Sequence, residues 1–121
     1  MAAHIHVPAL DSTHSLATSM SKQVTTTLLR DELGFKGLVF SDALNMKGVS
    51  QFYKPGEVEY KAYLAGNDIL LFAEDVPTAV ALFEKAFQDN TMDIIDFEQR
   101  VKSILAAKFN LGLSKQQQAH R

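Results

Sequence analysis

The chain has 121 residues, of which 46% are hydrophobic and 21% charged, enough for one domain with a moderate core. A net charge of −2 and scattered basic residues give no reason to expect nucleic acid or an anionic membrane as a partner. The absence of cysteine excludes disulfides and thiolate metal sites, and no apolar run reaches the ~20 residues of a membrane span. No charged-then-apolar signal segment opens the chain, so the compartment stays open between cytoplasm and periplasm.

Short apolar runs alternate with amphipathic stretches, which predicts βα units around a parallel sheet. The first strand is predicted over residues 3–7, and a polar loop follows over 11–21. A first helix is expected to begin near Ser21 as its N-cap. It ends before Gly34, since glycine readily takes the left-handed backbone conformation that closes many helices.

The middle of the chain predicts two further βα units. The second strand covers 38–41, and a loop through residues 45–48 follows it. A second helix spans 57–65 and stops at Gly66. The third strand is predicted over 68–73, apolar on both faces as in a covered parallel sheet.

Two amphipathic helices complete the pattern. Asp75 is predicted to cap a third helix, and a fourth runs over 93–109 before a polar tail at 114–121. Both are expected to bury one apolar face at helical spacing. The predicted core residues are Val76, Val80, Phe83 and Phe87 in the third helix and Ile94, Phe97, Val101, Ile104, Leu105 and Phe109 in the fourth.

Asp42 is the leading candidate for chemistry. It directly follows a buried apolar run, at the carboxyl end of a strand, where α/β proteins place reactive groups. The alternative is a turn-forming or capping aspartate, and position alone does not separate the two. No other acid occurs between Glu32 and Glu57, so any partner in acid–base chemistry comes from a distant segment.

His4 and His6 stand two residues apart on one face of the first predicted strand. Two imidazoles alone do not complete a metal site, and no nearby glutamate or cysteine adds to them. We therefore predict no metal and no cofactor. Three βα units with an acid at a strand end would also suit a receiver-like binding module. An acidic pair near the first strand, which would hold Mg²⁺ there, is absent.

The segment GFKGLVFSDALNMKGV, residues 34–49, closely resembles the nucleophile region of the family 3 glycoside hydrolases, in particular their β-N-acetylglucosaminidase branch. Other segments resemble the same catalytic barrel in consecutive order: AHIHVPALD its sixth strand, AYLAGNDILLFAED its seventh helix and eighth strand, and RVKSILAAKFNLGL its terminal helix. The resemblance implies an α/β fold that is part of a (β/α)₈ TIM barrel, about the last three βα units plus a C-terminal helix. Residues 1–113 would be the C-terminal portion of the catalytic domain.

The resemblance implies roles for four residues. Asp42 matches the nucleophile that forms a covalent glycosyl-enzyme in retaining enzymes. Asn45 and Met46 match the loop after the nucleophile and are expected to shape the sugar pocket. His4 matches a histidine at the end of the sixth strand and is a further candidate for substrate binding.

The resemblance also implies parts that these 121 residues do not contain. In the β-N-acetylglucosaminidase branch, a histidine–aspartate dyad on a K-H-F-P-G-H-G-type loop supplies acid–base catalysis, and no such motif occurs in this sequence. A complete barrel takes ~250 residues. The chain is therefore expected to be a fragment with little turnover alone. Because an open piece of barrel exposes strand edges and an apolar inner face, self-association or pairing with the missing barrel half is expected.

The implied substrate is terminal β-linked N-acetylglucosamine of peptidoglycan or chitin-like glycans. A family 3 β-glucosidase segment and a non-catalytic βα interaction module remain alternatives. The sequence SDALNMKG, residues 41–48, favours the hexosaminidase branch.

Overall fold

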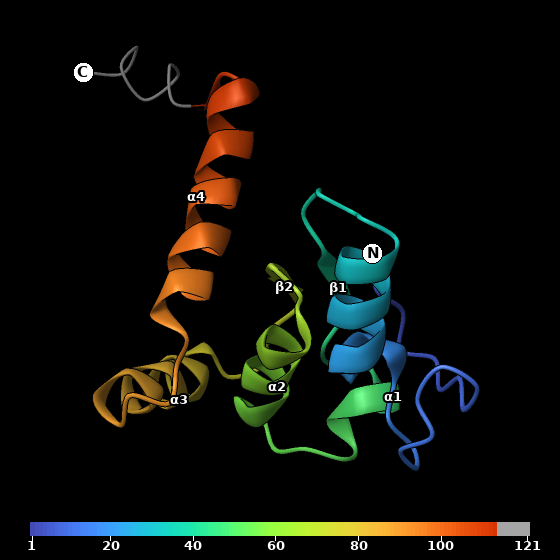
Figure 1. Cartoon of the computed structure of the whole chain (residues 1–121). Coiled ribbons are helices and arrows are strands. Elements are labelled where there is room, and N and C mark those ends of the chain that lie inside the picture. Colours follow the sequence, from blue (N-terminus) through green and yellow to red (C-terminus); the bar gives the residue numbers. More distant parts are fainter. Residues whose placement is uncertain (114–121) are drawn as a thin grey trace.

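The computed structural model describes residues 1–113, so the polar tail predicted at 114–121 lies outside the described residues. It is an α/β structure with a small parallel sheet and helices around it (Figure 1). None of the helices within the described part is both long and apolar enough to cross a membrane.

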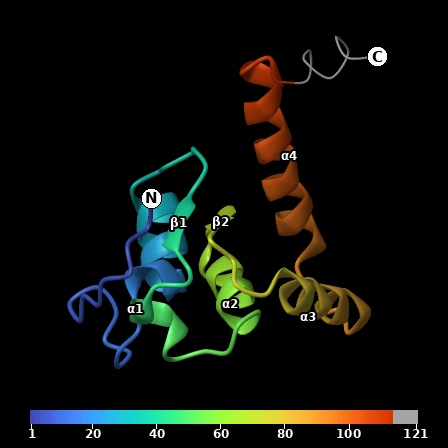
Figure 2. The same ribbon diagram turned by 180° about the vertical axis from the view of Figure 1, so that it is seen from behind.

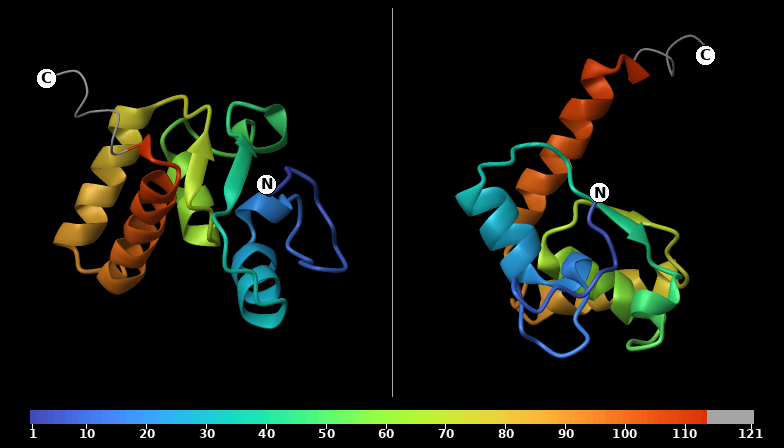
Figure 3. Two further views of the ribbon diagram at one scale, coloured as in Figure 1. Left: turned by 90° about the horizontal axis from the view of Figure 1, so that it is seen from above. Right: turned by 90° about the vertical axis from the view of Figure 1, so that its right-hand side faces the viewer.

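The sheet brings three distant segments together in parallel. Strand β1 (Phe40–Ala43) pairs with β2 (Ile69–Leu71), and Ala2 forms an isolated parallel bridge with Ser41 on the other side of β1. The two strands lie side by side and point the same way in the left view of Figure 3. Their carboxyl ends therefore share one edge of the sheet, as the βα pattern predicts.

The first predicted strand, 3–7, is wrong: none of these residues lies in a strand, and the isolated bridge is just before them, at Ala2. The carbonyl of Ala3 accepts from Ser19 N–H, and the carbonyl of Ile5 accepts from Thr18 N–H. A polar turn thus takes the hydrogen bonds that a neighbouring strand would otherwise take. His6 and Ile5 are both exposed, so the predicted separation into two faces does not form.

The other two strands differ from prediction in their bounds. The predicted strand 38–41 begins and ends two residues later, so Asp42 lies within β1. The predicted strand 68–73 shortens to β2, because Phe72 turns into a left-handed conformation with φ of 49°. The loop predicted over 45–48 contains the start of a short helix, α1.

Local capping signals fix most helix ends where the sequence predicts them. Ser21 Oγ accepts from Val24 N–H near the start of the first long helix, and Gly34 follows its end with φ of 70°. Asp75 accepts from Thr78 N–H at the start of the third predicted helix. The helices are η1 (Thr18–Met20), the wide-turned η2 (Gln23–Glu32), α1 (Lys47–Ser50), α2 (Glu57–Ala65), α3 (Val76–Gln88) and α4 (Ile94–Asn110).

Two apolar clusters form the core. One gathers around the segment that follows β1 and includes Leu44, Val49 and Ala62. The other joins α2, α3 and the start of α4 through Tyr63 and Phe97, whose ring centroids lie 6.2 Å apart. Leu70 of β2 packs against both clusters, so the helical side of the sheet is continuous.

The predicted apolar faces of α3 and α4 are only partly buried, which corrects the sequence prediction. Phe83, Phe87 and Phe97 pack together as expected. Helix α4 extends away from the sheet in Figures 1 and 2, and no element among residues 1–113 covers its C-terminal half. The predicted core residues that remain exposed are Val76, Val80, Ile94, Val101, Leu105 and Phe109.

Candidate active site

Asp42 lies near the carboxyl end of β1, half-buried, at the shared edge of the sheet. Its backbone N–H donates to the Ala2 carbonyl at 3.0 Å, which anchors it to the N-terminal segment. Among the described residues, its carboxylate has one hydrogen-bond partner, the Ala43 N–H at 2.8 Å from Oδ1. The second carboxylate oxygen, Oδ2, accepts no hydrogen bond within that part of the chain, which suits a group that must reach a ligand.

The pairing of β1 with β2 is shifted beside Asp42, as at a β-bulge. Phe40 pairs with Ile69 and Ala43 with Leu71, so β1 uses one more residue than β2 over the same length. Ser41 fills the gap, because its buried Oγ accepts from Leu71 N–H at 3.0 Å. Bulges bend a strand and re-aim its side chains, and they are frequent next to active sites.

His4 connects the N-terminal segment to the turn after Asp42. Its Nε2 lies 2.9 Å from the Ala43 carbonyl oxygen, which can only accept, so Nε2 carries a proton. Its Nδ1 lies 2.6 Å from the buried Ser19 Oγ. Both ring nitrogens are thus occupied by protein groups, which fixes the ring and holds the turn. A hollow of about 210 Å³ opens beside it, lined by His4, His6, Ser15, Ala17, Gly48 and Phe52.

The turn after Asp42 carries the other two predicted residues. Asn45 and Met46 are both exposed, and the Met46 carbonyl accepts from Val49 and Ser50 N–H groups to begin α1. The structure therefore places Asn45 and Met46 in the turn that directly follows the strand of Asp42, with His4 against that turn. No hydrogen bond joins their side chains within residues 1–113.

A buried glutamate that sequence reasoning missed holds the loop that follows the carboxyl end of β2. Glu59, 2% exposed, accepts from Gly56 N–H at 2.7 Å through Oε2. Its Oε1 accepts from Glu74 N–H at 2.7 Å and from Asp75 N–H at 3.4 Å. One side chain thus caps α2 and holds the loop after β2. The glutamate at the third position of a helix is the signal that could have found it.

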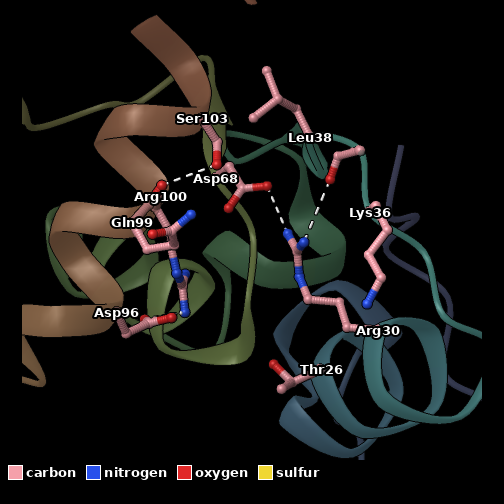
Figure 4. Close-up of a pocket in the computed structure, with 10 residues that line it drawn as sticks. Thr26, Arg30, Lys36, Leu38, Asp68, Asp96, Gln99, Arg100 and Ser103 are labelled. Atoms are coloured by element: carbon pink, nitrogen blue, oxygen red, sulfur yellow. Dashed lines mark hydrogen bonds and ion pairs between the residues drawn. The ribbon is translucent and has the colours of Figure 1, made fainter. Parts of the chain in front are cut away.

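An ion pair between Arg30 and Asp68 lies at the start of both strands (Figure 4). This is the amino end of the sheet, whereas Asp42 lies near the carboxyl end. Asp68 Oδ2 accepts from Arg30 Nη2 at 2.6 Å and from Val39 N–H at 2.7 Å. A pocket of about 140 Å³ lies here, between η2 and α4. The Arg30–Asp68 pair contacts the amino ends of the strands. It therefore fixes the register of the strands and lies away from Asp42.

Asp11 fixes the polar segment that leads into η2. Ser21 Oγ donates to Asp11 Oδ2 at 2.5 Å, and Thr13 N–H donates to Oδ1 at 2.9 Å. The Ser21 hydrogen bond, with the Thr13 bonds next, holds the pKa of the Asp11 carboxyl below its usual value of 3.8. These bonds stabilise the ionised carboxylate of Asp11 in the folded chain, and they are absent from the unfolded chain.

Asp11→Asn is expected to lower the melting temperature most clearly above pH 3.8. The depressed pKa adds stability that is fully present above the unfolded pKa and is lost as pH falls through the folded value. Thermal melts from pH 7 to pH 2.5 should therefore show the difference between the two proteins shrinking only below pH 3.8. A difference that stays constant down to pH 2.5 would contradict this expectation.

Comparison with known proteins gives consistent matches. A model of the glycosyl hydrolase family 3 N terminal domain matches residues 1–107. A beta-hexosaminidase A of Pseudoalteromonas piscicida is 34% identical over 97% of this chain, and a beta-hexosaminidase of Vibrio cholerae serotype O1 is 39% identical over 69% of it. The solved family 3 β-N-acetylglucosaminidase of Paenibacillus sp. str. FPU-7 superposes with a TM-score of 0.75 and 32% identity, covering 84% of this chain.

The matched region is a small part of each relative. The chain spans 19% of the Pseudoalteromonas protein, 24% of the Vibrio protein and 20% of the Paenibacillus chain.

Proposed function

Because the chain belongs to glycosyl hydrolase family 3, we propose that it is the nucleophile-bearing segment of a retaining β-N-acetylglucosaminidase. The observation that carries this proposal is the position of Asp42. It stands half-buried at the carboxyl end of β1, beside a bulge, with one carboxylate oxygen that accepts no hydrogen bond from residues 1–113. The likeness to proteins named beta-hexosaminidase supports the choice of sugar.

The proposed reaction proceeds in two displacements. An Asp42 carboxylate oxygen attacks the anomeric carbon, the bond to the leaving oxygen breaks, and a covalent glycosyl-enzyme forms. Water then attacks the same carbon, releases the sugar and restores the carboxylate. The substrate class is terminal β-linked N-acetylglucosamine of peptidoglycan or chitin-like glycans. Asn45 and Met46, exposed in the turn after Asp42, would contact the sugar, and His4 would hold that turn in place.

The partial barrel of the sequence prediction is the architecture we propose for residues 1–113. Its support is the parallel order of the Ala2 segment, β1 and β2, each followed by helix. In a complete barrel, the carboxyl ends of such strands form the catalytic face. In that architecture, Asp42 would lie on the catalytic face and the Arg30–Asp68 pair on the opposite face.

The 121 residues contain no acid–base loop of the expected type, and no hydrogen bond or ion pair among the described residues links Asp42 to a second acid. A leaving group that needs protonation would therefore depart slowly. Hydrolysis of the glycosyl-enzyme would also be slow, because the missing acid–base residue is the group that activates water in that step. The chain is expected to turn over an unactivated chitobioside slowly or not at all.

Activated aryl glycosides test the proposal, because a good leaving group needs little acid assistance. The chain should release about one equivalent of phenolate from an aryl β-N-acetylglucosaminide in a fast burst, followed by slow turnover. A matched aryl β-glucoside separates the hexosaminidase from the β-glucosidase alternative, since the stronger burst identifies the sugar. Absence of a burst with both glycosides would contradict a functional nucleophile in this chain.

We also propose that the chain associates with itself. Its α4 presents Ile95, Leu105 and Phe109 at 83, 58 and 67% exposure, an apolar surface that no described element covers. Light scattering after size exclusion should give a mass above the 13.4 kDa of one chain. The double variant Leu105→Lys, Phe109→Lys should shift it toward 13.4 kDa, whereas Ser103→Lys, exposed on another side of α4, should not.

A monomeric wild-type chain at concentrations up to about 100 µM would contradict this expectation, because a specific association with a Kd at or below that concentration would populate the oligomer.

A further inference from the structure

Phe72 has a backbone conformation that aromatic residues rarely adopt. Its φ is 49°, in the left-handed region that favours glycine, and its side chain is 73% exposed. A bulky residue in this region is strained, and such strain persists only where the surroundings fix the backbone. Strained positions of this kind concentrate at ligand sites, which makes the setting of Phe72 informative.

The backbone on both sides of Phe72 is held firmly. Leu71 donates its N–H to Ser41 Oγ at 3.0 Å and accepts from Leu44 N–H at 2.9 Å. Two residues after Phe72, the Glu74 N–H donates to the buried Glu59 carboxylate at 2.7 Å. The sheet and Glu59 therefore confine the turn to Phe72 and Ala73, and Phe72 takes the left-handed conformation that closes it.

This turn directs the ring away from the core. Leu70 packs against both core clusters, and side chains two apart along a strand share a face. A continued strand would therefore bury Phe72 on the helical side. The left-handed turn instead leaves the ring in solvent at the carboxyl end of β2. Its neighbour Leu71 pairs with Ala43, which directly follows Asp42.

We infer that Phe72 is a stacking residue for the sugar that Asp42 attacks. This inference rests on the proposed function. A β-linked glucose-type ring carries its hydroxyls around the rim and its C–H groups on the two faces, so an exposed aromatic face can cover it. The same edge of the sheet offers a carboxylate for the anomeric carbon and a ring for the apolar face. Phe72 thereby selects pyranose rings that have an unobstructed C–H face.

The test is the rate of covalent labelling of the 121-residue chain by an activated aryl 2-deoxy-2-fluoro glycoside, measured by intact mass over a range of concentrations. Phe72→Gly is the informative variant, because glycine accepts the left-handed backbone and removes only the ring. It should raise the half-saturating concentration by about tenfold, the scale of losing one stacking aromatic. Its maximal labelling rate should remain within about twofold, because Asp42 is untouched.

Three further measurements define the outcome. Phe72→Tyr should label like the wild type, and Phe109→Ala, which removes an exposed aromatic from α4, should also leave labelling unchanged. Phe72→Gly should melt at the same or a higher temperature, because the backbone strain is relieved. Equal half-saturation in the wild type and Phe72→Gly would overturn the stacking role while leaving Asp42 as nucleophile. Absence of labelling in the folded wild type would overturn the proposed function, and the stacking role with it.

Discussion

Asp42→Asn is expected to eliminate the phenolate burst from an activated aryl β-N-acetylglucosaminide, with a loss on the order of 10³-fold or more in the rate of the first displacement. An amide keeps the size of the side chain but lacks the negative charge that attacks the anomeric carbon. The Ala43 N–H can still donate to the amide oxygen, so the turn should keep its shape. Stopped-flow absorbance of the released phenolate measures the burst directly.

Asp31→Asn is the matched control, since this aspartate is exposed on η2, away from the carboxyl ends of the strands. It should retain the full burst amplitude. Circular dichroism should give the same melting temperature for Asp42→Asn and the wild type within a few degrees. A burst that survives in Asp42→Asn would show that another group, or the substrate's own acetamide, displaces the leaving group.

Glu59→Ala is expected to destabilise the fold strongly, by about 3 kcal/mol in the free energy of unfolding. The side chain is 2% exposed, and its two oxygens accept from three backbone N–H groups. Alanine would leave these donors unpaired and open a cavity beside α2. Because small domains are stable by only about 5–15 kcal/mol, this is a large fraction of the total.

Urea unfolding followed by circular dichroism measures this effect. Glu98→Ala serves as the control, because Glu98 is 60% exposed and its contact with Lys102 is 3.6 Å long. Its change should stay within about 0.5 kcal/mol. Glu59→Gln, which keeps a single acceptor oxygen, should fall between the two. A free-energy loss below about 1 kcal/mol in Glu59→Ala would mean that water replaces the carboxylate without cost.

Much of the fold can be predicted from the sequence because helix ends depend on local chemistry. Gly34, Gly66 and Asp75 mark boundaries that the structure confirms, and α2 spans the predicted residues. Strand bounds are less predictable, because they depend on which distant groups accept the backbone hydrogen bonds. The carbonyl groups of Ala3 and Ile5 bond to η1 rather than to a strand, which the local pattern does not reveal.

The exposed faces of α3 and α4 show a second limit. Helical spacing correctly identifies which residues share a face, but it does not say whether an element is available to cover that face. Phe97 packs against Tyr63, Phe83 and Phe87, whereas Leu105 stays exposed and no element within residues 1–113 covers it. The same surface supports the expectation of association.

The position of Asp42 in the candidate site could be predicted from the sequence, but the contacts of the residues around it could not. Asp42 follows from a strand end, and its role as nucleophile stays a prediction. The hydrogen bond of Ser41 depends on a bulge, and the turn at Phe72 is held by a glutamate thirteen residues earlier. The helix-capping position of Glu59 is visible in the sequence. Its contact with Glu74 and the pairing of β1 with β2 join distant segments, and no local pattern specifies them.

The most direct test of the central claim is intact-mass analysis of the chain after incubation with an activated 2-deoxy-2-fluoro glycoside, followed by peptide mapping. We expect a gain of one sugar, located on Asp42 and absent from Asp42→Asn. An unlabelled chain with the circular dichroism of a folded α/β protein, or a sugar attached to another residue, would contradict Asp42 as the nucleophile.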